Sequence, residues 1–437
     1  MGISMACHAA RRKEVLEQME KGSAMLLFGA REVLRNGDAE YAYRQDSDLW
    51  YLTGWHDPEV ALLLVPGAEN PCVLFVQPKN PEMEVWTGIR PGTKGAVDDF
   101  GLNAAFEWSA LAEELTTRLQ GVHTLHYAVG EDASRDALVF GAIKGARRAV
   151  RFNFKCLPDQ FVNPSRLLHE MRLFKGPEEE ALLRRAAEIT REAHVEAMKM
   201  AKPGMNEGEL YAFIDYTFRR RGGNGAGYTS IVGGGDNACI LHYIENNSTL
   251  NDGDLLLIDA GCELENYTAD VTRTFPVNGR FSEPQKAIYS IVLKANEAVI
   301  EQVRVGTPFK DLQAVCIRSL TEGMVQLGLL EGDVDQLIKD KAYRPFYMHG
   351  VSHYLGLDVH DVGLYAVDGS SRCLAEGMVL TVEPGLYLAP DNLSVPEEYR
   401  GIGVRIEDDI LVGSNGPINL TSSIPKTIEA VEAACVG

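Results

Sequence analysis

Three histidines fall within one short glycine-rich stretch, and they are the first residues that suggest chemistry. His349, His353 and His360 lie within twelve residues, although the whole chain of 437 residues has only ten histidines. Imidazole binds metal ions through a neutral nitrogen and transfers protons near neutral pH. Only two residues of the stretch 349–363 are charged, which is not typical of a solvated polar surface. The stretch is therefore predicted to form one wall of an active site.

Carboxylates at the ends of apolar strands are predicted to form the other walls. Four of them stand beside such runs: Asp259 after 255–258, Asp270 before 271–275, Glu383 after 378–382, and Glu407 after 403–406. An unpaired buried carboxylate is strongly unfavourable. Four of them beside a histidine cluster therefore predict a buried cation.

The ligand types narrow the choice of metal. Carboxylate oxygens and imidazole, with no obvious thiolate, favour Mn²⁺, Co²⁺, Fe²⁺ or a catalytic Zn²⁺ over a structural zinc. Four carboxylates carry too much negative charge for one divalent ion, so two ions sharing bridging carboxylates are expected, as in two-metal hydrolases. Alternatively, each carboxylate caps a turn or pairs with an arginine, and each histidine is structural. That explanation suits any one of these residues better than all of them together.

Composition excludes several classes of function. The net charge is 42 − 62 = −20 and there is no long basic run, so nucleic acid is not an expected partner. No apolar run is long enough to span a membrane, and no secretory signal is apparent. The eight cysteines are scattered and form no Cys-x-x-Cys pair, which predicts reduced thiols and a cytoplasmic location.

The order of elements indicates two domains. Short apolar runs, including 49–53, predict strands of a mixed α/β region that also holds all four tryptophans, expected to pack in its core. A boundary is predicted near 155–176, where Asn163-Pro164 and Gly176-Pro177 interrupt the pattern. Helices are predicted at 177–200, 206–221, 282–303 and 308–327, with the acid-bearing strands between and after them.

The acids and one histidine, in their order and spacing, resemble the metal ligands of a known group, the pita-bread metallopeptidases. These ligands would be Asp259, Asp270, His353, Glu383 and Glu407. Within that group, the segments 258–276, 344–363, 377–387 and 399–410 closely resemble the bacterial aminopeptidase P (Xaa-Pro aminopeptidase) family, as do 169–175 and 43–48 upstream. The resemblance covers nearly the whole chain, and no ligand position is substituted.

This resemblance implies a role for each ligand. Asp259 would bind one metal, Asp270 and Glu407 would bridge both, and His353 and Glu383 would hold the other. The expected cofactor is a pair of divalent ions, foremost Mn²⁺, with Co²⁺ or Zn²⁺ as alternatives. A hydroxide between the ions would be the nucleophile.

Other residues match catalytic and supporting positions of the family. His242 and His360 would contact substrate and stabilise the tetrahedral intermediate or pass a proton to the leaving nitrogen, and His349 would bind substrate. Arg405 and Tyr387 would orient the ligand carboxylates. The predicted catalytic set is His242, His349, His360, Glu383 and Arg405.

The resemblance also implies the architecture and activity. An α/β domain over 1–170 would control substrate access and oligomerisation, and an α+β pita-bread domain over 171–437, with a curved antiparallel sheet, would be catalytic. The expected activity is release of the first residue from peptides with proline in second position. A homodimer or homotetramer is expected, with Trp86 either in the core or at a neighbouring subunit's site.

Two alternatives remain open. A prolidase would share the fold and ligands but cleave Xaa-Pro dipeptides. A non-catalytic peptide-binding protein on this scaffold would be expected to have lost metal ligands. Methionine aminopeptidase is disfavoured because it usually lacks so large an N-terminal domain.

Overall fold

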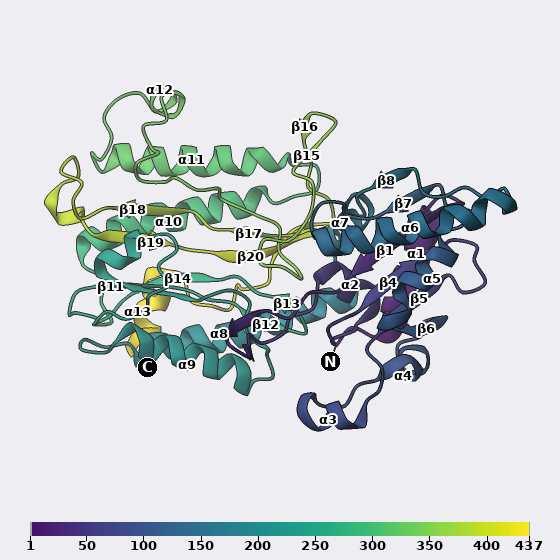
Figure 1. Cartoon of the computed structure of the whole chain (residues 1–437). Coiled ribbons are helices and arrows are strands. Elements are labelled where there is room, and N and C mark those ends of the chain that lie inside the picture. Colours follow the sequence, from purple (N-terminus) through teal and green to yellow (C-terminus); the bar gives the residue numbers. More distant parts are fainter. Residues whose placement is uncertain (1, 437) are drawn as a thin grey trace. The chain divides into compact units, whose positions relative to one another are not determined.

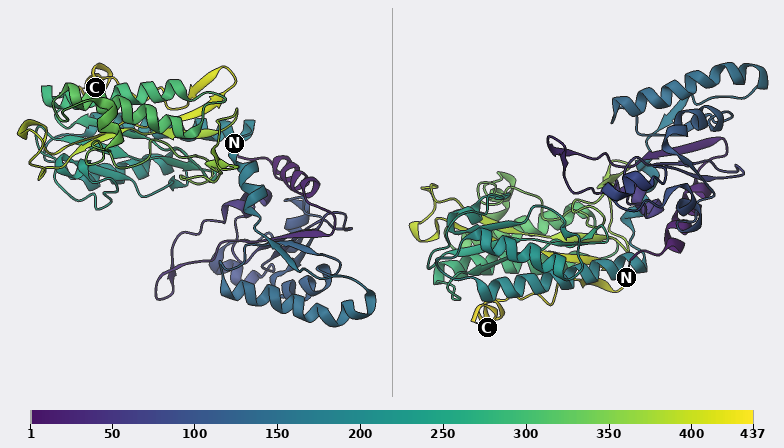
Figure 2. Two further views of the ribbon diagram at one scale, coloured as in Figure 1. Left: turned by 90° about the horizontal axis from the view of Figure 1, so that it is seen from above. Right: turned by 60° about the horizontal axis from the view of Figure 1, so that its bottom comes forward.

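The computed structural model describes residues 2–436, which form two compact units (Figures 1 and 2). The N-terminal unit is Ile3–Met171, and the C-terminal unit comprises Gly2 and the residues from Arg172 on. Helix α7 (Ser165–Leu173) spans the boundary. Within residues 2–436, every helix is too short or too polar to cross a lipid bilayer.

The N-terminal unit is built on a mixed six-stranded sheet in the order β6-β5-β4-β1-β7-β8. Its strands are β1 (Ser23–Phe28), β4 (Ala61–Leu64), β5 (Cys72–Val76), β6 (Ala104–Glu107), β7 (Thr124–His126) and β8 (Gln160–Val162). The pairs β1–β4 and β4–β5 are antiparallel and the others parallel. Apolar side chains of α5 (Leu111–Arg118) and α6 (Ala133–Asn153), such as Leu115 and Val139, share one core with the sheet. The predicted α/β class is confirmed.

Two local predictions in this unit were wrong. Residues 47–53 form a helix, α2 (Ser47–Thr53), because the Asp46 side chain accepts from the Leu49 amide at 2.9 Å and Gly54 ends the helix at φ 68°. The helix is buried almost all round, so its apolar run has no helical period. Trp50 and Trp55 are buried as expected, but Trp86 on α3 (Pro81–Thr87) is 84% exposed.

The remaining N-terminal elements are helices α1 (Met5–Gln18) and α4 (Gly92–Asp98) and a small hairpin of β2 (Leu34–Asn36) and β3 (Ala39–Glu40). The long helix α6 was not predicted. Its last turns, from Arg147 on, contribute no buried side chain, so the apolar stripe that identifies a helix is present only in its first half.

The C-terminal unit contains several small antiparallel sheets made of short strands. One sheet has the order β10-β11-β14, from Ile231–Gly234, Leu255–Asp259 and Thr272–Pro276. Further sheets are β17-β20-β21 (Val379–Val382, Asp408–Gly413, Gly416–Asn419), β18-β19 (Gly385–Leu388, Ile402–Arg405) and β13-β12-β9 (Tyr267–Thr268, Cys262–Leu264, Gly225–Ala226). The Glu407 amide donates to the Thr272 carbonyl at 3.1 Å. This bond joins the short connection between β19 and β20 to β14.

Helices cover both sides of these strands (Figure 1). On one side are α8 (Pro177–Met200), α9 (Glu207–Arg220) and the C-terminal α13 (Ile428–Val436); on the other are α10 (Glu283–Gln302) and α11 (Phe309–Gln326). The four predicted helices in this region are thus confirmed. A short α12 (Val334–Lys339) and a hairpin of β15 (Ala366–Val367) and β16 (Ser370–Ser371) complete the unit.

Candidate metal centre

Two strands of one sheet bring the first pair of acids together. Asp259 ends β11 and pairs in register with Thr272 of β14, and Asp270 lies just before β14 begins. The hydroxyl of Tyr228 lies 2.6 Å from Asp259 Oδ1 and 2.5 Å from Asp270 Oδ1. A hydroxyl has only one proton to donate, so the second short contact needs a proton on a carboxyl group or a cation between the oxygens.

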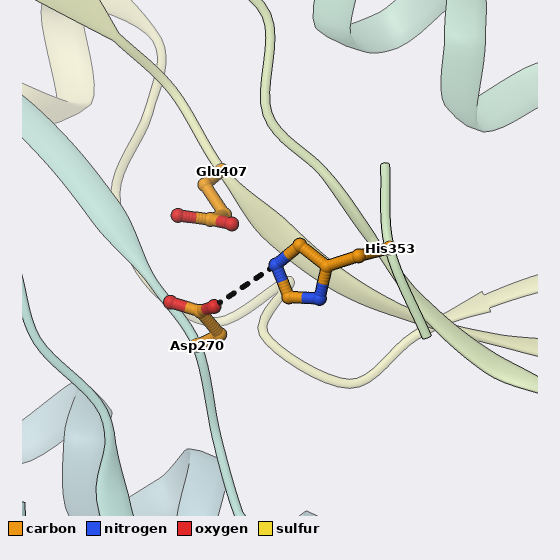
Figure 3. A group of neighbouring side chains, drawn as sticks. All are labelled: Asp270, His353 and Glu407. Atoms are coloured by element: carbon orange, nitrogen blue, oxygen red, sulfur yellow. Dashed lines mark ion pairs between the residues drawn. The ribbon is translucent and has the colours of Figure 1, made fainter. Parts of the chain in front are cut away.

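Three potential ligands, one of them Asp270, converge at this point (Figure 3). One ligand atom from each of Asp270, His353 and Glu407 lies within 4.8 Å of the other two. The Nε2 atom of His353 is 3.4 Å from Asp270 Oδ2. Thr272 donates its hydroxyl to Glu407 Oε2 at 2.7 Å and thereby fixes this carboxyl group.

The fifth predicted ligand, Glu383, follows β17. Its amide donates to the Val351 carbonyl at 2.9 Å, which ties the end of β17 to the histidine-rich stretch. His353 Nε2 lies 3.6 Å from Glu383 Oε1. On the far side of the same ring, His353 Nδ1 is 2.9 Å from the Tyr354 carbonyl, so Nδ1 donates a proton there and Nε2 is the nitrogen that faces the acids.

Arg405 organises the opposite edge of the group. From β19, its guanidinium donates to Asp259 Oδ2 at 2.7 Å, to the Tyr387 hydroxyl at 3.0 Å and to the Thr272 hydroxyl at 2.9 Å. The Tyr387 hydroxyl also lies 2.9 Å from His349 Nε2. One chain of contacts therefore links a ligand carboxylate to a histidine of the glycine-rich stretch.

All nine predicted site residues line one cleft with a volume of about 580 Å³. They are His242, Asp259, Asp270, His349, His353, His360, Glu383, Arg405 and Glu407. The rings of His353 and His360 meet edge to face with centroids 4.3 Å apart. Ile231, Leu241, Ile244 and Tyr365 give part of the wall an apolar character. The individual roles of these residues remain predictions.

Crowding of the acids shifts their proton affinity. Burial raises the pKa of Glu383 to about 7, and burial followed by the neighbouring carboxylates raises the pKa of Glu407 well above its ordinary value. Burial also raises the pKa of Asp270. For His353, burial alone lowers the pKa, but Asp270 and Glu383 outweigh it and bring the value to about 9.

In His349 and His360, the other two histidines of the stretch, burial prevails and the pKa falls, since burial disfavours a charged ring. With help from nearby Arg405 it lowers the pKa of His349 to about 4, and with help from His353 it lowers the pKa of His360.

The donor set fits a divalent cation. Buried carboxyl groups whose pKa is raised by burial and mutual repulsion are the groups that a cation would stabilise as anions. Oxygen donors with one imidazole suit Mn²⁺, Co²⁺ or Zn²⁺. The outer contacts also fit, because Tyr354, Thr272 and Arg405 hold three of the would-be ligands in place.

Helix α8 holds the turn that follows Asp259. His194 Nε2 lies 3.0 Å from the Ala260 carbonyl, and the Thr190 hydroxyl accepts from the Cys262 amide at 3.0 Å. Burial lowers the pKa of His194 to about 4, so it stays neutral. Gly261 is required in this turn, because a Cβ there would lie 1.7 Å from the Ala269 carbonyl oxygen.

Sequence reasoning missed several contributors. Tyr228 comes from a glycine-rich loop that carries no charge pattern, and no sequence signal identifies it. Asp409 had a signal, because Glu407, Asp408 and Asp409 form an acidic run inside an apolar segment. Asp409 Oδ2 accepts from the Asp270 amide at 3.1 Å, and Asp408 pairs with Arg273 at 2.8 Å. The three acids therefore differ in role: Glu407 is a predicted metal ligand, Asp408 forms a buried ion pair, and Asp409 holds the backbone of Asp270.

Comparison with known proteins agrees with this fold. The model of metallopeptidase family M24 matches residues 181–414, and that of the aminopeptidase P N-terminal domain matches residues 8–126. The chain belongs to metallopeptidase family M24, in the branch that carries an aminopeptidase P N-terminal domain. It is an enzyme of this metallopeptidase class, with a pita-bread domain, and the resemblance seen in the sequence is confirmed.

Three relatives illustrate the match. The chain is 48% identical to the Xaa-Pro aminopeptidase of Escherichia coli strain K12, over 98% of this chain and 96% of the relative. The structure of the Pseudomonas aeruginosa aminopeptidase PepP superimposes with a TM-score of 0.97 at 45% identity, covering 99% of this chain and 98% of the other. Zinc-substituted E. coli aminopeptidase P in complex with product gives a TM-score of 0.96 at 47% identity, covering 100% and 99%.

Proposed function

We propose that this protein is a metal-dependent aminopeptidase that removes the first residue from peptides with proline in second position. The observation that carries the proposal is the meeting of five ligand side chains at one cleft with three further histidines beside them. The relative from Escherichia coli strain K12 is named an Xaa-Pro aminopeptidase, which favours this activity over that of a prolidase. The complete ligand set argues against a non-catalytic binding protein.

Two divalent ions are the proposed cofactor, held by Asp259, Asp270, His353, Glu383 and Glu407. Four carboxylates balance the charge of two such ions better than that of one. Mn²⁺ is the proposed metal and Co²⁺ or Zn²⁺ the alternatives, since oxygen-rich sites with one imidazole accept all three. When bound, such ions lower the pKa of water and polarise a carbonyl group.

The protein residues around this centre supply orientation and proton transfer. Arg405 and Thr272 keep the Asp259 and Glu407 carboxyl groups in place for binding. Because its pKa is lowered, His360 is neutral near pH 7, and its ring is available to exchange a proton with the substrate. His242 would contact the substrate and stabilise negative charge that develops on the carbonyl oxygen, and His349 would bind substrate.

The substrate fits this chemistry. The bond before proline has no N–H, so the site must act through the carbonyl and the leaving nitrogen alone. The departing secondary amine needs a proton, and the histidines beside the acids are placed to deliver it. The acids would also attract the positively charged amino terminus of a peptide.

The test is peptide cleavage by chelator-treated protein with Mn²⁺, Co²⁺ or Zn²⁺ returned. The substrates are an Xaa-Pro-Yaa tripeptide, the matching Xaa-Pro dipeptide and Met-Ala. We expect metal-dependent release of Xaa from the tripeptide, with little dipeptide cleavage, and the rates would rank the metals. Cleavage of the dipeptide alone would assign the protein as a prolidase, and no cleavage with any metal would contradict the proposed function.

We further propose that residues 1–170 restrict access and mediate assembly into a homodimer or homotetramer, and that residues 171–437 are the catalytic domain. Support for assembly comes from Val85, Trp86 and Ile89, which are 82%, 84% and 84% exposed and form an apolar surface suited to a second copy. We also propose a cytoplasmic location. All eight cysteines lie within residues 2–436 and are free thiols, which fits a reducing compartment.

A further inference from the structure

The loop that carries His242 connects β10 to β11, and in its middle one inward-facing side chain stands between two that face the cleft. The loop runs from Gly234 at the end of β10, through the 3₁₀ turn Gly235–Cys239, to Ser248. His242 and Ile244 are exposed and line the cleft, whereas Tyr243 between them is only 7% exposed. The position of the His242 ring therefore depends on the contacts that hold the inward-facing Tyr243.

A fully buried glutamate holds this loop. Glu207, the first residue of α9, is 0% exposed, and both of its carboxyl oxygens face the loop. Oε1 accepts from the Gly234 amide at 2.8 Å and from Asn237 Nδ2 at 3.1 Å. Oε2 accepts from the Tyr243 hydroxyl at 2.8 Å and from the Ser248 amide at 2.8 Å. One carboxyl group thus joins the beginning, middle and end of the loop.

Capping of α9 does not explain this glutamate. The helix already has a capping box: the Asn206 side chain accepts from the Gly208 amide at 2.8 Å, and Glu209 accepts from the Asn206 amide at 3.0 Å. A negative charge at a helix N-terminus is favourable. Its four hydrogen bonds all go to the loop of His242.

A second anchor, Asn246, lies three residues beyond Tyr243. Asn246 adopts φ 48°, a left-handed conformation that asparagine tolerates. Its side chain accepts from the Val232 amide at 2.8 Å and donates to the Ser230 carbonyl at 2.9 Å. Tyr243 and Asn246 thus hold the backbone that follows His242 at two points.

We propose that Glu207 is a positioning residue, which acts through the Tyr243 hydroxyl to fix the place of His242 in the cleft. This inference rests on the proposed function, in which His242 contacts substrate. Displacing a catalytic group by about 1 Å can cost 100-fold in rate. Loss of the anchor should therefore reduce turnover without removing metal, because neither Glu207 nor Tyr243 is among the proposed ligands.

The first test compares Tyr243→Phe, which removes only the hydroxyl, with Glu207→Gln. The glutamine would turn an N–H group toward loop groups that are themselves hydrogen-bond donors. Glu209→Gln is the matched control, since Glu209 is an exposed glutamate of the same helix turn. With tripeptide substrate we expect kcat to fall about tenfold for Tyr243→Phe and 10- to 100-fold for Glu207→Gln, with metal content unchanged. Glu209→Gln should stay within about twofold of the original protein. Unchanged kcat for Tyr243→Phe would overturn the inference.

A double-mutant cycle separates positioning from plain stability. If Tyr243 acts through His242, Tyr243→Phe should cost less than about twofold when His242→Ala is already present. An undiminished tenfold loss in that background would show that the hydroxyl acts by another route and would overturn the inference. Thermal unfolding of every variant would show whether the losses are explained by unfolding at the assay temperature.

A readout that needs no turnover distinguishes the inference from the proposed function. Imidazole nitrogen NMR of the zinc-loaded protein, with the His242 signal assigned by its absence in His242→Ala, should show that signal shifted or broadened in Tyr243→Phe. The His360 signal should not move. An unmoved His242 signal would overturn the inference. Failure of the original protein to cleave the tripeptide would contradict only the proposed function, and the NMR result would still decide whether Tyr243 positions His242.

Discussion

At the scale of single residues, protons and metal cations compete for the carboxyl groups of the centre. Burial raises the pKa of Glu383 to about 7, so this group holds a proton over much of the range below neutrality. His353, whose pKa is brought to about 9 by Asp270 and Glu383, also holds a proton until a metal displaces it. Metal binding must therefore release protons.

We expect the apparent affinity of chelator-treated protein for Mn²⁺ to rise as the pH is raised from about 6 to about 8. Below its raised pKa each site binds a proton that the metal has to displace, and one displaced proton changes the affinity about tenfold for each pH unit. Titration calorimetry in buffers of different ionisation enthalpy would measure both the affinity and the protons released. A pH-independent affinity would contradict this explanation.

Asp270 links three parts of the centre, since it contacts Tyr228 and His353 and its amide donates to the Asp409 carboxyl group. We expect Asp270→Ala to lose at least one metal ion, measured by elemental analysis. Removing an outer-sphere partner of a metal typically costs 10- to 100-fold, so loss of a direct ligand should reduce kcat by more than about 100-fold. Asp252→Ala, at an exposed aspartate, is the control. Full activity of Asp270→Ala would rule out the two-metal assignment.

At the scale of elements, the ligand-bearing strand ends could be predicted because each breaks an apolar run with a charge. Asp259 and Glu383 are examples, and both lie where the pattern indicated. Helices with an apolar stripe and caps, such as α8 and α10, were equally clear. Residues that act through distant contacts gave no signal, since Tyr228 meets Asp270 across 42 positions of sequence. Helix α2 was mistaken for a strand because burial on all sides removes the helical period.

The histidine-rich stretch has almost no regular structure, so it depends on buried ion pairs. Asp361, next to His360, accepts from Arg172 at 2.7 Å and from Lys175 at 2.9 Å. Burial alone would raise the pKa of Asp361, but Lys175 and Arg172 outweigh it and hold the pKa below its usual range. Arg172 also pairs with Asp358 at 2.7 Å, and that carboxylate is 36% exposed, against 1% for Asp361.

These two aspartates form a matched pair for mutation. We expect Asp361→Asn to destabilise the protein by about 3–5 kcal/mol, because it removes the buried carboxylate that Lys175 and Arg172 share. Asp358→Asn should cost no more than about 1 kcal/mol, because water screens a partly exposed pair. Urea unfolding of the C-terminal unit would measure both changes. Equal losses would mean that burial does not determine the strength of these pairs.

We expect the same two variants to lose activity in the order in which they lose stability. Because the Asp361 amide donates to the Tyr354 carbonyl at 2.8 Å, a shift of Asp361 would move the backbone beside both His353 and His360. We expect kcat/KM for the tripeptide to fall about tenfold in Asp361→Asn, while Asp358→Asn stays close to the original protein.

At the scale of the whole molecule, each unit has its own hydrophobic core. One core combines Leu26, Leu63 and Val139 in the N-terminal unit, and another combines Ile258 and Leu380 in the C-terminal unit. All of the proposed metal ligands belong to the C-terminal unit. A unit with a separate core can unfold on its own, so metal binding should stabilise one unit directly and not the other.

Calorimetry can test this separation. We expect two unfolding transitions for chelator-treated protein, and addition of Mn²⁺ at about 100 times its dissociation constant should stabilise only one of them by about 2.7 kcal/mol. For a unit of this size that corresponds to roughly 5–10 °C in melting temperature. In Asp270→Ala the shift should shrink, because the ligand set is incomplete, while the other transition stays in place. A single transition that moves as a whole with metal would mean that the two units unfold cooperatively, and the centre would then stabilise the entire chain.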